Sequence, residues 1–294
     1  MGFYDRLDAA WSAHDSMLCV GIDPEPERFP AVVGRSPARI PEFVAAIVEA
    51  TADLVCAYKP QIAHFAALGA ERELEASIAV IRRLAPDALV ILDAKRGDIG
   101  STARRYAREA FDRYDADAVT VNPYLGSDGL EPFIERADRG VIVLCRTSNP
   151  SSAELQSADE RDPLYARVAR LAAGPWNRNR NLMLVAGATH PHDLQQIRDI
   201  APELPLLVPG LGAQGGDPGS IVRAGIDARG RGLVVSSSRA ILYASAEGDF
   251  ADAARAEAIR SRDALRNAAR GVHVNAGPTR ATMHNQPSDQ DRSK

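Results

Sequence analysis

The stretch Ala88–Tyr106, ALVILDAKRGDIGSTARRY, decides the fold of this chain. It opens on the short, apolar and β-branched run Ala88–Leu92, which is typical of a strand buried on both faces. Because side chains alternate across a strand, we predict that Asp93 and Lys95 point the same way. Burying charge is costly unless the charge has a use, so a plain surface ion pair is the less favoured explanation of these two residues.

A tight turn is predicted directly after that strand. Gly97 and Gly100 allow the chain to bend sharply, and Ser101 or Thr102 can cap the amphipathic helix that follows. Asp98 then lies in the turn itself, so three charged side chains gather at the carboxyl end of one strand. A carboxylate about 4 Å from a lysine favours the ammonium form by roughly 4 kcal/mol at an effective dielectric constant of about 20. We therefore expect the lysine of this strand to be a proton donor and not a base or a Schiff-base nucleophile.

The length and composition are those of an ordinary soluble protein. The 294 residues contain no long polar linker before about residue 270, so the chain has the size of one large α/β barrel or of two small domains. A formal net charge of -4, without clustered Lys and Arg, argues against broad nucleic-acid binding. The N-terminus has no long apolar segment, so we expect neither a signal peptide nor a membrane span.

Three cysteines, Cys19, Cys56 and Cys145, each lie inside an apolar run and show no CxxC spacing. We interpret them as small buried hydrophobic residues in a reducing compartment. Neither a disulfide framework nor a zinc site is indicated, and we expect the protein to be cytoplasmic.

Eight apolar strand candidates alternate with helical segments, and this alternation favours a closed parallel barrel over an open sheet. We predict an α/β fold, a single (β/α)8 TIM barrel over residues 1–270, whose last helix is Asp249–Arg270. Residues 271–294 are rich in Asn, Gln, Pro, Ser, Asp and Thr and are predicted to be a disordered tail. The predicted strands are Met17–Asp23, Leu54–Lys59, Leu89–Lys95, Ala118–Asn122, Val141–Arg146, Leu182–Gly187, Leu206–Pro209 and Leu233–Ser238.

Most of these strands end in polar side chains, and in such barrels catalytic side chains gather at the carboxyl ends of the strands. One polar strand end would be unremarkable, but so many together indicate a site. The residues concerned are Asp23, Lys59, Asp93, Lys95, Asn122, the run Arg146–Asn149, Pro209 and Arg239.

Two further segments are suited to binding an anion. The glycines of Val208–Gly216, VPGLGAQGG, let backbone N–H groups approach an anion, and Gln214 adds a side-chain amide. Ser236–Arg239, SSSR, opens the predicted helix Ala240–Ala244, where backbone amides and a guanidinium can converge. Loops after strands seven and eight commonly bind phosphate in barrels, so the pair predicts a phosphate site.

Other polar features are assigned structural roles. His190 and His192 stand two apart at a predicted helix start, but no carboxylate or cysteine at suitable spacing completes a metal site. His64 follows the second strand and is interpreted as structural. The Ser-, Glu- and Asp-rich stretch Ser151–Asp162 is interpreted as a solvated loop in preference to a lid.

The ordered set LDAKRGDIGST, VPGLGAQGG and SSSR resembles the orotidine 5′-phosphate decarboxylase family, and YKPQIA after the second strand resembles its longer bacterial subgroup. The resemblance covers about residues 16–245. It implies that the chain converts orotidine 5′-phosphate to UMP with release of carbon dioxide, the last step of de novo pyrimidine nucleotide synthesis. It also implies that the reaction needs no cofactor and no metal.

The resemblance further implies a role for each matching residue of the charged cluster. Lys95 would protonate C6 of the pyrimidine, with Asp93 and Asp98 in a charged network around it. Asp98 and Thr102 would reach into the site of a neighbouring subunit, so a homodimer with sites at the interface is expected.

The remaining matches concern substrate binding. Asp23 and Lys59 match positions that contact the ribose, and Ser148 matches the residue that contacts the pyrimidine amide, although Thr147 beside it leaves that assignment open. His64 stands where related sequences carry an aromatic residue, so its role stays open too. The phosphate loops supply the last candidates, Pro209, Gln214, Ser238 and Arg239.

Two other functions compete with this one. A magnesium-dependent sugar-phosphate decarboxylase or aldolase of the same barrel family would share the aspartate, lysine and aspartate of strand three. It would need a further acidic ligand after strand one or two, and Lys59 occupies the second of these places. A non-catalytic phosphoribosyl-binding protein would have lost Lys95 or Asp93, and both are present.

Overall fold

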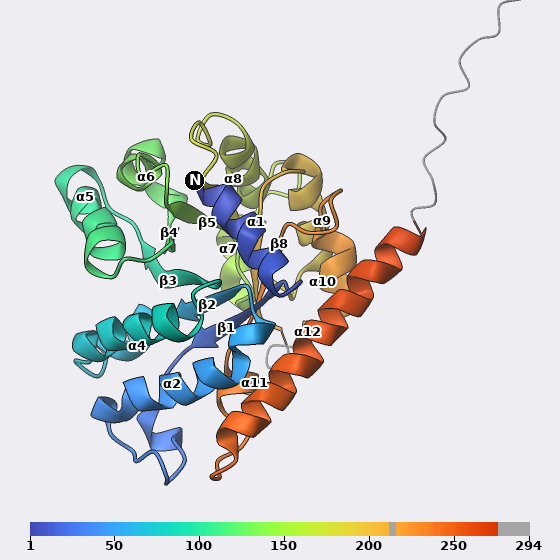
Figure 1. The fold of residues 1–294 in the computed structure, drawn as a ribbon. Helices are drawn as coiled ribbons and strands as arrows, with labels where there is room; N and C mark the ends of the chain where they lie inside the picture. The colour runs from blue at the N-terminus through green and yellow to red at the C-terminus, as the bar shows by residue number, and fades with distance from the viewer. Residues whose placement is uncertain (212–215, 276–294) are drawn as a thin grey trace, which may run out of the picture.

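The computed structural model describes residues 1–211 and 216–275, and their strands close into a parallel barrel (Figure 1). Each strand pairs in parallel with the next along the chain, and the eighth pairs with the first. The predicted (β/α)8 fold is therefore confirmed. The strands are β1 (Leu18–Ile22), β2 (Ala57–Pro60), β3 (Leu89–Arg96), β4 (Ala118–Val121), β5 (Gly140–Arg146), β6 (Leu182–Ala186), β7 (Leu206–Pro209) and β8 (Leu233–Ser237).

Most of the helices surround this ring of strands (Figure 1). In α4, Leu74, Ile78 and Ile81 recur at a spacing of three or four residues and are buried against the barrel. The helices are α1 (Phe3–Ala13), α2 (Ile40–Thr51), α3 (Ile62–Ala66), α4 (Glu71–Leu84), α5 (Gly100–Arg108), α6 (Ser127–Ile134), α7 (Ala153–Gln156), α8 (Leu164–Ala173), α9 (Pro191–Ile200), α10 (Pro218–Gly225), α11 (Arg239–Leu242) and α12 (Phe250–Asn275).

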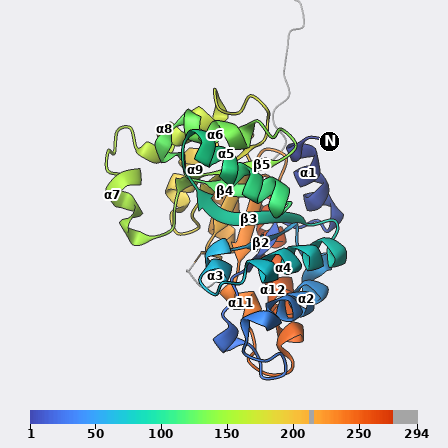
Figure 2. The same cartoon turned by 90° about the vertical axis from the view of Figure 1, so that its left-hand side faces the viewer.

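Helix α1 covers the end of the barrel at which the strands begin. The Trp11 indole N–H donates to the Leu233 carbonyl at 2.8 Å, and the Tyr4 hydroxyl donates to the Leu182 carbonyl at 2.7 Å. Both acceptors are the first residues of their strands. Figure 2 shows α1 and α7 at opposite ends of the barrel, so α7 lies at the end that carries the polar strand termini.

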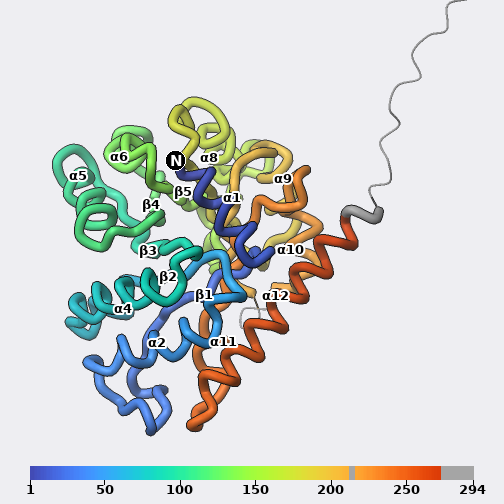
Figure 3. Tube along the Cα trace, in the orientation of Figure 1, coloured from blue at the N-terminus to red at the C-terminus, as the bar shows by residue number. Residues whose placement is uncertain are grey.

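Helix α12 packs along α2, α10 and α11 at the outside of the barrel (Figure 3). It extends to Asn275, past the predicted end at Arg270. A single helical glycine costs only about 1 kcal/mol relative to alanine, so Gly271 does not end the helix. The rest of the predicted tail, residues 276–294, lies outside the described residues.

The three cysteines are free and buried, as predicted. Burial raises the pKa of Cys19 to about 12 and that of Cys145 above its usual range, so both are thiols at neutral pH. Within residues 1–211 and 216–275, no helix has both the length and the apolar character that a bilayer crossing needs.

The buried Arg198 of α9 forms hydrogen bonds with the chain segments that precede the last two strands. Its side chain is buried, although the guanidinium carries a charge. That charge is met by five hydrogen bonds, which go to the carbonyls of Gly225, Leu204, Ala201, Pro202 and Gly232. These hydrogen bonds lie at the end of the barrel where β7 and β8 begin, away from the polar strand termini.

We expect Arg198→Met to lower the free energy of unfolding by about 3 kcal/mol, because it leaves buried carbonyls without donors while keeping a similar volume. Urea denaturation followed by circular dichroism measures the change. Arg198→Lys, which keeps the charge but offers fewer donors, should lose less. Equal stability of wild type and Arg198→Met would show that the carbonyls do not depend on this side chain.

Candidate active site

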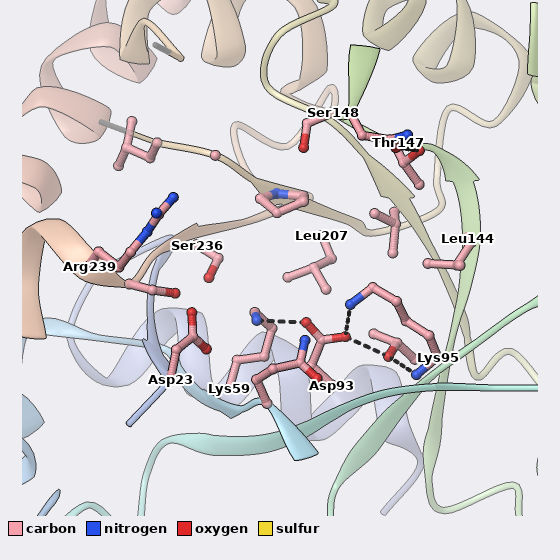
Figure 4. Close-up of a pocket in the computed structure, with 18 of the residues that line it drawn as sticks. Asp23, Lys59, Asp93, Lys95, Leu144, Thr147, Ser148, Leu207, Ser236 and Arg239 are labelled. Carbon is pink, nitrogen blue, oxygen red and sulfur yellow. Dashed lines mark hydrogen bonds and ion pairs between the residues drawn. The ribbon is translucent and has the colours of Figure 1, made fainter. Parts of the chain in front are cut away.

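A cavity of about 500 Å³ opens at the carboxyl ends of the strands (Figure 4). Its lining contains most of the residues that the sequence predicts for the site, although they come from six different strand ends and the loops that follow. The predicted residues brought together there are Asp23, Lys59, Asp93, Lys95, Ser148, Pro209, Ser238 and Arg239.

Three charged side chains form a row along one wall of this cavity (Figure 4). The Asp93 carboxylate receives Lys59 Nζ at 2.8 Å on one oxygen and Lys95 Nζ at 2.6 Å on the other. Lys59 and Asp93 are buried, whereas the Lys95 side chain is 48% exposed. Asp93 and Lys95 thus share a side of β3 as predicted, and the lysine end of the row faces the cavity.

The charges of the row stabilise one another. Burial alone would raise the pKa of Asp93, but the Lys59 and Lys95 ammonium groups outweigh it and hold that pKa well below its usual range. Burial likewise acts to lower the pKa of Lys59, but Asp93 and Asp23 outweigh it and raise that pKa above its usual value. At neutral pH, the Asp93 carboxylate and the Lys59 ammonium group are therefore both charged.

The β8 end of the cavity supplies a cation. Arg239 is exposed, and within the described residues its guanidinium forms no hydrogen bond or ion pair. Figure 4 shows it across the cavity from Lys95. The predicted helix Ala240–Ala244 is the short α11, which begins at Arg239 itself. Gln214, the other predicted phosphate contact, lies outside the described residues.

Close packing of β1 against the end of β8 depends on Gly21. A Cβ at this position would lie 1.8 Å from Ser238 Oγ, so a larger residue would displace the serine from the cavity wall. At the end of the same strand, Asp23 lines the cavity, and its buried Oδ1 has no hydrogen-bond partner among the described residues. A buried carboxylate oxygen without a donor is suited to accept a hydrogen bond from a ligand hydroxyl.

Thr147 and Ser148 both line the cavity after β5, so the geometry keeps both as candidates for the pyrimidine contact. Gln156 holds this segment: its Oε1 accepts from the Thr147 backbone N–H at 2.8 Å, and its Nε2 donates to Thr147 Oγ1 at 2.9 Å. Gln156 itself lines the cavity.

The prediction that Ser151–Asp162 is only a solvated loop is wrong for two of its residues. Ser152 is buried and accepts a hydrogen bond from the buried Arg146, and Gln156 reaches the cavity wall. Arg146 is fixed in turn by Asp193, whose carboxylate accepts from Nε at 2.7 Å. The polar composition of the segment predicted that it is exposed to solvent. Hydrogen bonds to a buried arginine of β5 instead keep part of the segment in the interior.

Sequence reasoning also missed Gln61 and Thr120, which line the cavity. A weak signal existed for each. Gln61 belongs to the quoted YKPQIA segment, and Thr120 is the polar residue inside an otherwise apolar strand.

Asp98 and Thr102 do not line the cavity of their own chain. The Asp98 carboxylate instead accepts from the Ile99 backbone N–H at 2.8 Å, which keeps it in the turn as predicted. The predicted cap is wrong, because α5 begins at Gly100 with φ +53° and neither Ser101 nor Thr102 caps it.

His64, His190 and His192 are not among the described residues that line the cavity. His64 is half-buried on α3, and its role stays open. Within the described residues, no group of three or more His, Cys, Asp or Glu side chains is arranged to hold a metal ion, and this includes the segment of His190 and His192.

Comparison with known proteins agrees with this geometry. Residues 16–256 match the model of the orotidine 5′-phosphate decarboxylase / HUMPS family. The chain is 57% identical over 266 residues to an orotidine 5′-phosphate decarboxylase of Dechloromonas aromatica, covering 90% of this chain and 98% of the relative. An orotidine 5′-phosphate decarboxylase of Azoarcus sp. is also 57% identical, with the same coverage of both chains.

Solved structures indicate the same family. The OMP decarboxylase of Leishmania donovani superposes with a TM-score of 0.80 at 37% identity, over 92% of this chain and 99% of that one. A protein of Toxoplasma gondii described as an orotidine-monophosphate decarboxylase superposes with a TM-score of 0.81 at 36% identity, over 91% and 97%. The chain therefore belongs to the orotidine 5′-phosphate decarboxylase / HUMPS family.

Proposed function

We propose that this chain decarboxylates orotidine 5′-phosphate to UMP without a cofactor, and that Lys95 is the acid that protonates C6 of the pyrimidine. The observation that carries the proposal is the Lys95 ammonium group, which is fixed by Asp93 at 2.6 Å and faces a cavity that presents the exposed Arg239 guanidinium at its other side. Family membership and the named reaction of close relatives support the reaction itself.

The chemistry demands a cation next to the reacting carbon. When the bond between C6 and the carboxylate breaks, its electron pair stays on C6, and no carbonyl is positioned to delocalise it. A nearby ammonium group stabilises this charge and then transfers its proton, which forms the C6–H bond of the product. The Lys59 ammonium group remains on Asp93, so the aspartate keeps a cationic partner after Lys95 becomes neutral.

The rest of the substrate fits the rest of the cavity. Asp23 Oδ1 can accept from a ribose hydroxyl, with Lys59 close to the same group, and Ser148 can contact the pyrimidine amide. Ser238 and Pro209 line the cavity together with the guanidinium after β8, and Gln214, which lies outside the described residues, is proposed as a phosphate contact from its sequence position alone. Binding energy from the phosphate, which does not react, can hold the ring against the ammonium group.

The magnesium-dependent alternative is disfavoured by the contacts of Asp93. One of its oxygens accepts from Lys59, and the other accepts from Lys95 and from the Thr120 hydroxyl. A carboxylate held by two ammonium groups is poorly placed to ligate a cation as well. A non-catalytic role is disfavoured because the complete charged row is present and faces a cavity.

We propose further that the protein is a cytoplasmic homodimer in which Asp98 and Thr102 complete the partner's site. Neither residue reaches its own cavity. Beside them, Ile99, Tyr124 and Leu125 are exposed apolar side chains, of the kind that interfaces bury. Gly129 links the two loops, since a Cβ there would lie 3.0 Å from the Asp98 carbonyl oxygen and 3.3 Å from Leu125 Cβ. Free cysteines fit the reducing cytoplasm.

Release of carbon dioxide from orotidine 5′-phosphate in excess EDTA tests the reaction and the role of Lys95 together. Wild type should be active, and Lys95→Ala should lose more than about a hundredfold in kcat, which is the lower end of what a general acid contributes. Circular dichroism and UMP binding serve as controls for folding.

Residual activity of Lys95→Ala above about one hundredth of wild type would assign the proton to another group. Activity of wild type that disappears with EDTA and returns with magnesium would favour the sugar-phosphate alternative.

Mixing Lys95→Ala with Asp98→Ala subunits tests the shared site. We expect each variant alone to be inactive and the mixture to regain activity, because a mixed dimer has one site with both residues intact. Random pairing puts about half of the dimers in this form in a two-fold assembly. Subunit exchange is verified with differently tagged chains, and a mixture that exchanges but stays inactive would place each site within one chain.

Arg239→Ala should weaken binding of orotidine 5′-phosphate about ten- to a hundredfold, because a charge-assisted contact is lost. The fall in kcat/KM should be at least as large if phosphate binding also aligns the ring. Orotidine without phosphate is the control substrate, which wild type and Arg239→Ala should process equally slowly. An equal loss with both substrates would move Arg239 from the phosphate site to the fold or the pyrimidine pocket.

A further inference from the structure

Thr120 is a buried residue of β4 whose hydroxyl contacts the charged row from the neighbouring strand. Its side chain oxygen accepts from the backbone N–H groups of Ala94 and Lys95, at 2.9 Å each. The same hydroxyl donates to Asp93 Oδ1 at 2.9 Å, and Thr120 is only 1% exposed. One hydroxyl thus bonds three consecutive residues of β3.

These contacts use the full capacity of the hydroxyl, which has one proton and two lone pairs. A backbone N–H group can only donate a hydrogen bond, so the two N–H groups are the donors and Thr120 Oγ1 is the acceptor. The only proton of the hydroxyl is therefore directed at Asp93 Oδ1. That oxygen is the one that also accepts from Lys95 Nζ. The arrangement fixes Asp93 Oδ1 as an acceptor and orients it toward the lysine.

The backbone of β3 needs such support at this point. Its pairing with β4 shifts register between Leu92 and Arg96, and Lys95 adopts φ +47°. This left-handed conformation is unfavourable for a residue with a Cβ, so the surrounding contacts must hold it. The bonds from Thr120 to the N–H groups of Ala94 and Lys95 lie within the shifted segment.

We propose that Thr120 is a positioning residue for the protonation step, which sets both the Lys95 backbone and the Asp93 carboxylate that holds its ammonium group. The inference rests on the proposed decarboxylation. Thr120 acts through Asp93 and Lys95, so it affects the rate of the chemical step and leaves ribose and phosphate binding intact. A role confined to stability would instead lower the melting temperature without a specific effect on kcat.

Three variants separate these roles. Thr120→Val keeps the shape of the side chain but removes the hydroxyl, whereas Thr120→Ser keeps the hydroxyl. Thr51→Val is the matched control: its buried hydroxyl bonds the Ile47 carbonyl at 2.7 Å and the Tyr58 hydroxyl at 2.8 Å, and it does not line the cavity. Kinetics with orotidine 5′-phosphate, the dissociation constant of UMP and the melting temperature are measured for each.

Thr120→Val should lose about ten- to a hundredfold in kcat, the value of a hydrogen bond to a charged group, with the dissociation constant of UMP close to that of wild type. Thr120→Ser should recover most of this loss. Thr51→Val should lower the melting temperature while its kcat stays near wild type. If Thr120→Val does not fold, Thr120→Cys, with a similar size and only a weak donor, should show the same loss of kcat at unchanged UMP binding.

A kcat of Thr120→Val within about threefold of wild type would overturn the proposal. So would a Thr120→Ser variant as slow as Thr120→Val, or an equal loss of kcat in Thr51→Val. If wild type released no carbon dioxide at all, the proposed function would fail, and this outcome is distinct from any difference among the variants.

Discussion

The rest of the site depends on one constraint, the burial of the Asp93 carboxylate beneath the open end of the barrel. A buried charge is tolerated only with charged and hydrogen-bonded partners around it. Lys59 comes from β2 and Lys95 from the end of β3 itself, and the adjacent pairing of these strands places the two ammonium groups on opposite oxygens. The strand order of the closed barrel therefore supplies the partners that compensate the buried charge. The charged row in turn fixes the Lys95 ammonium group, which we propose as the acid.

The closed barrel also gives the site its direction. Helix α1 occupies the end at which the strands begin, through bonds such as that of Trp11 to the first residue of β8. The strand ends that carry polar side chains consequently converge at the other end, where the cavity lies. Stability and chemistry are thus placed at opposite ends of the same strands. Arg198 binds carbonyls at the starts of β7 and β8, whereas Arg239, two residues past β8, lines the cavity at the opposite end.

Periodic and local signals made the fold and most of the site predictable. Eight apolar runs marked the strands, and polar residues at their carboxyl ends, such as Asp23 and Lys59, line the cavity as a consequence of topology alone. One prediction failed because of contacts between distant segments, and another failed for a local reason. Gln156 looked solvated because its neighbours are polar, yet the buried Arg146 anchors that segment against the cavity. The cap at Ser101 or Thr102 failed because Gly100, with φ +53°, starts the helix without one.

The charged and polar groups of the cavity fall into two physical classes. The Asp93 row is already satisfied within the described chain, so the ammonium group of Lys95 is held in place before a substrate arrives, and little reorganisation remains for the chemical step. Asp23 Oδ1 and the Arg239 guanidinium have no partner there, so they gain most from a ligand that brings hydroxyls and a phosphate. Groups of the first class are suited to act on a transition state, and those of the second to supply binding energy. In the proposed reaction, the first class would act on the reacting carbon and the second would bind the phosphate from the opposite side of the cavity.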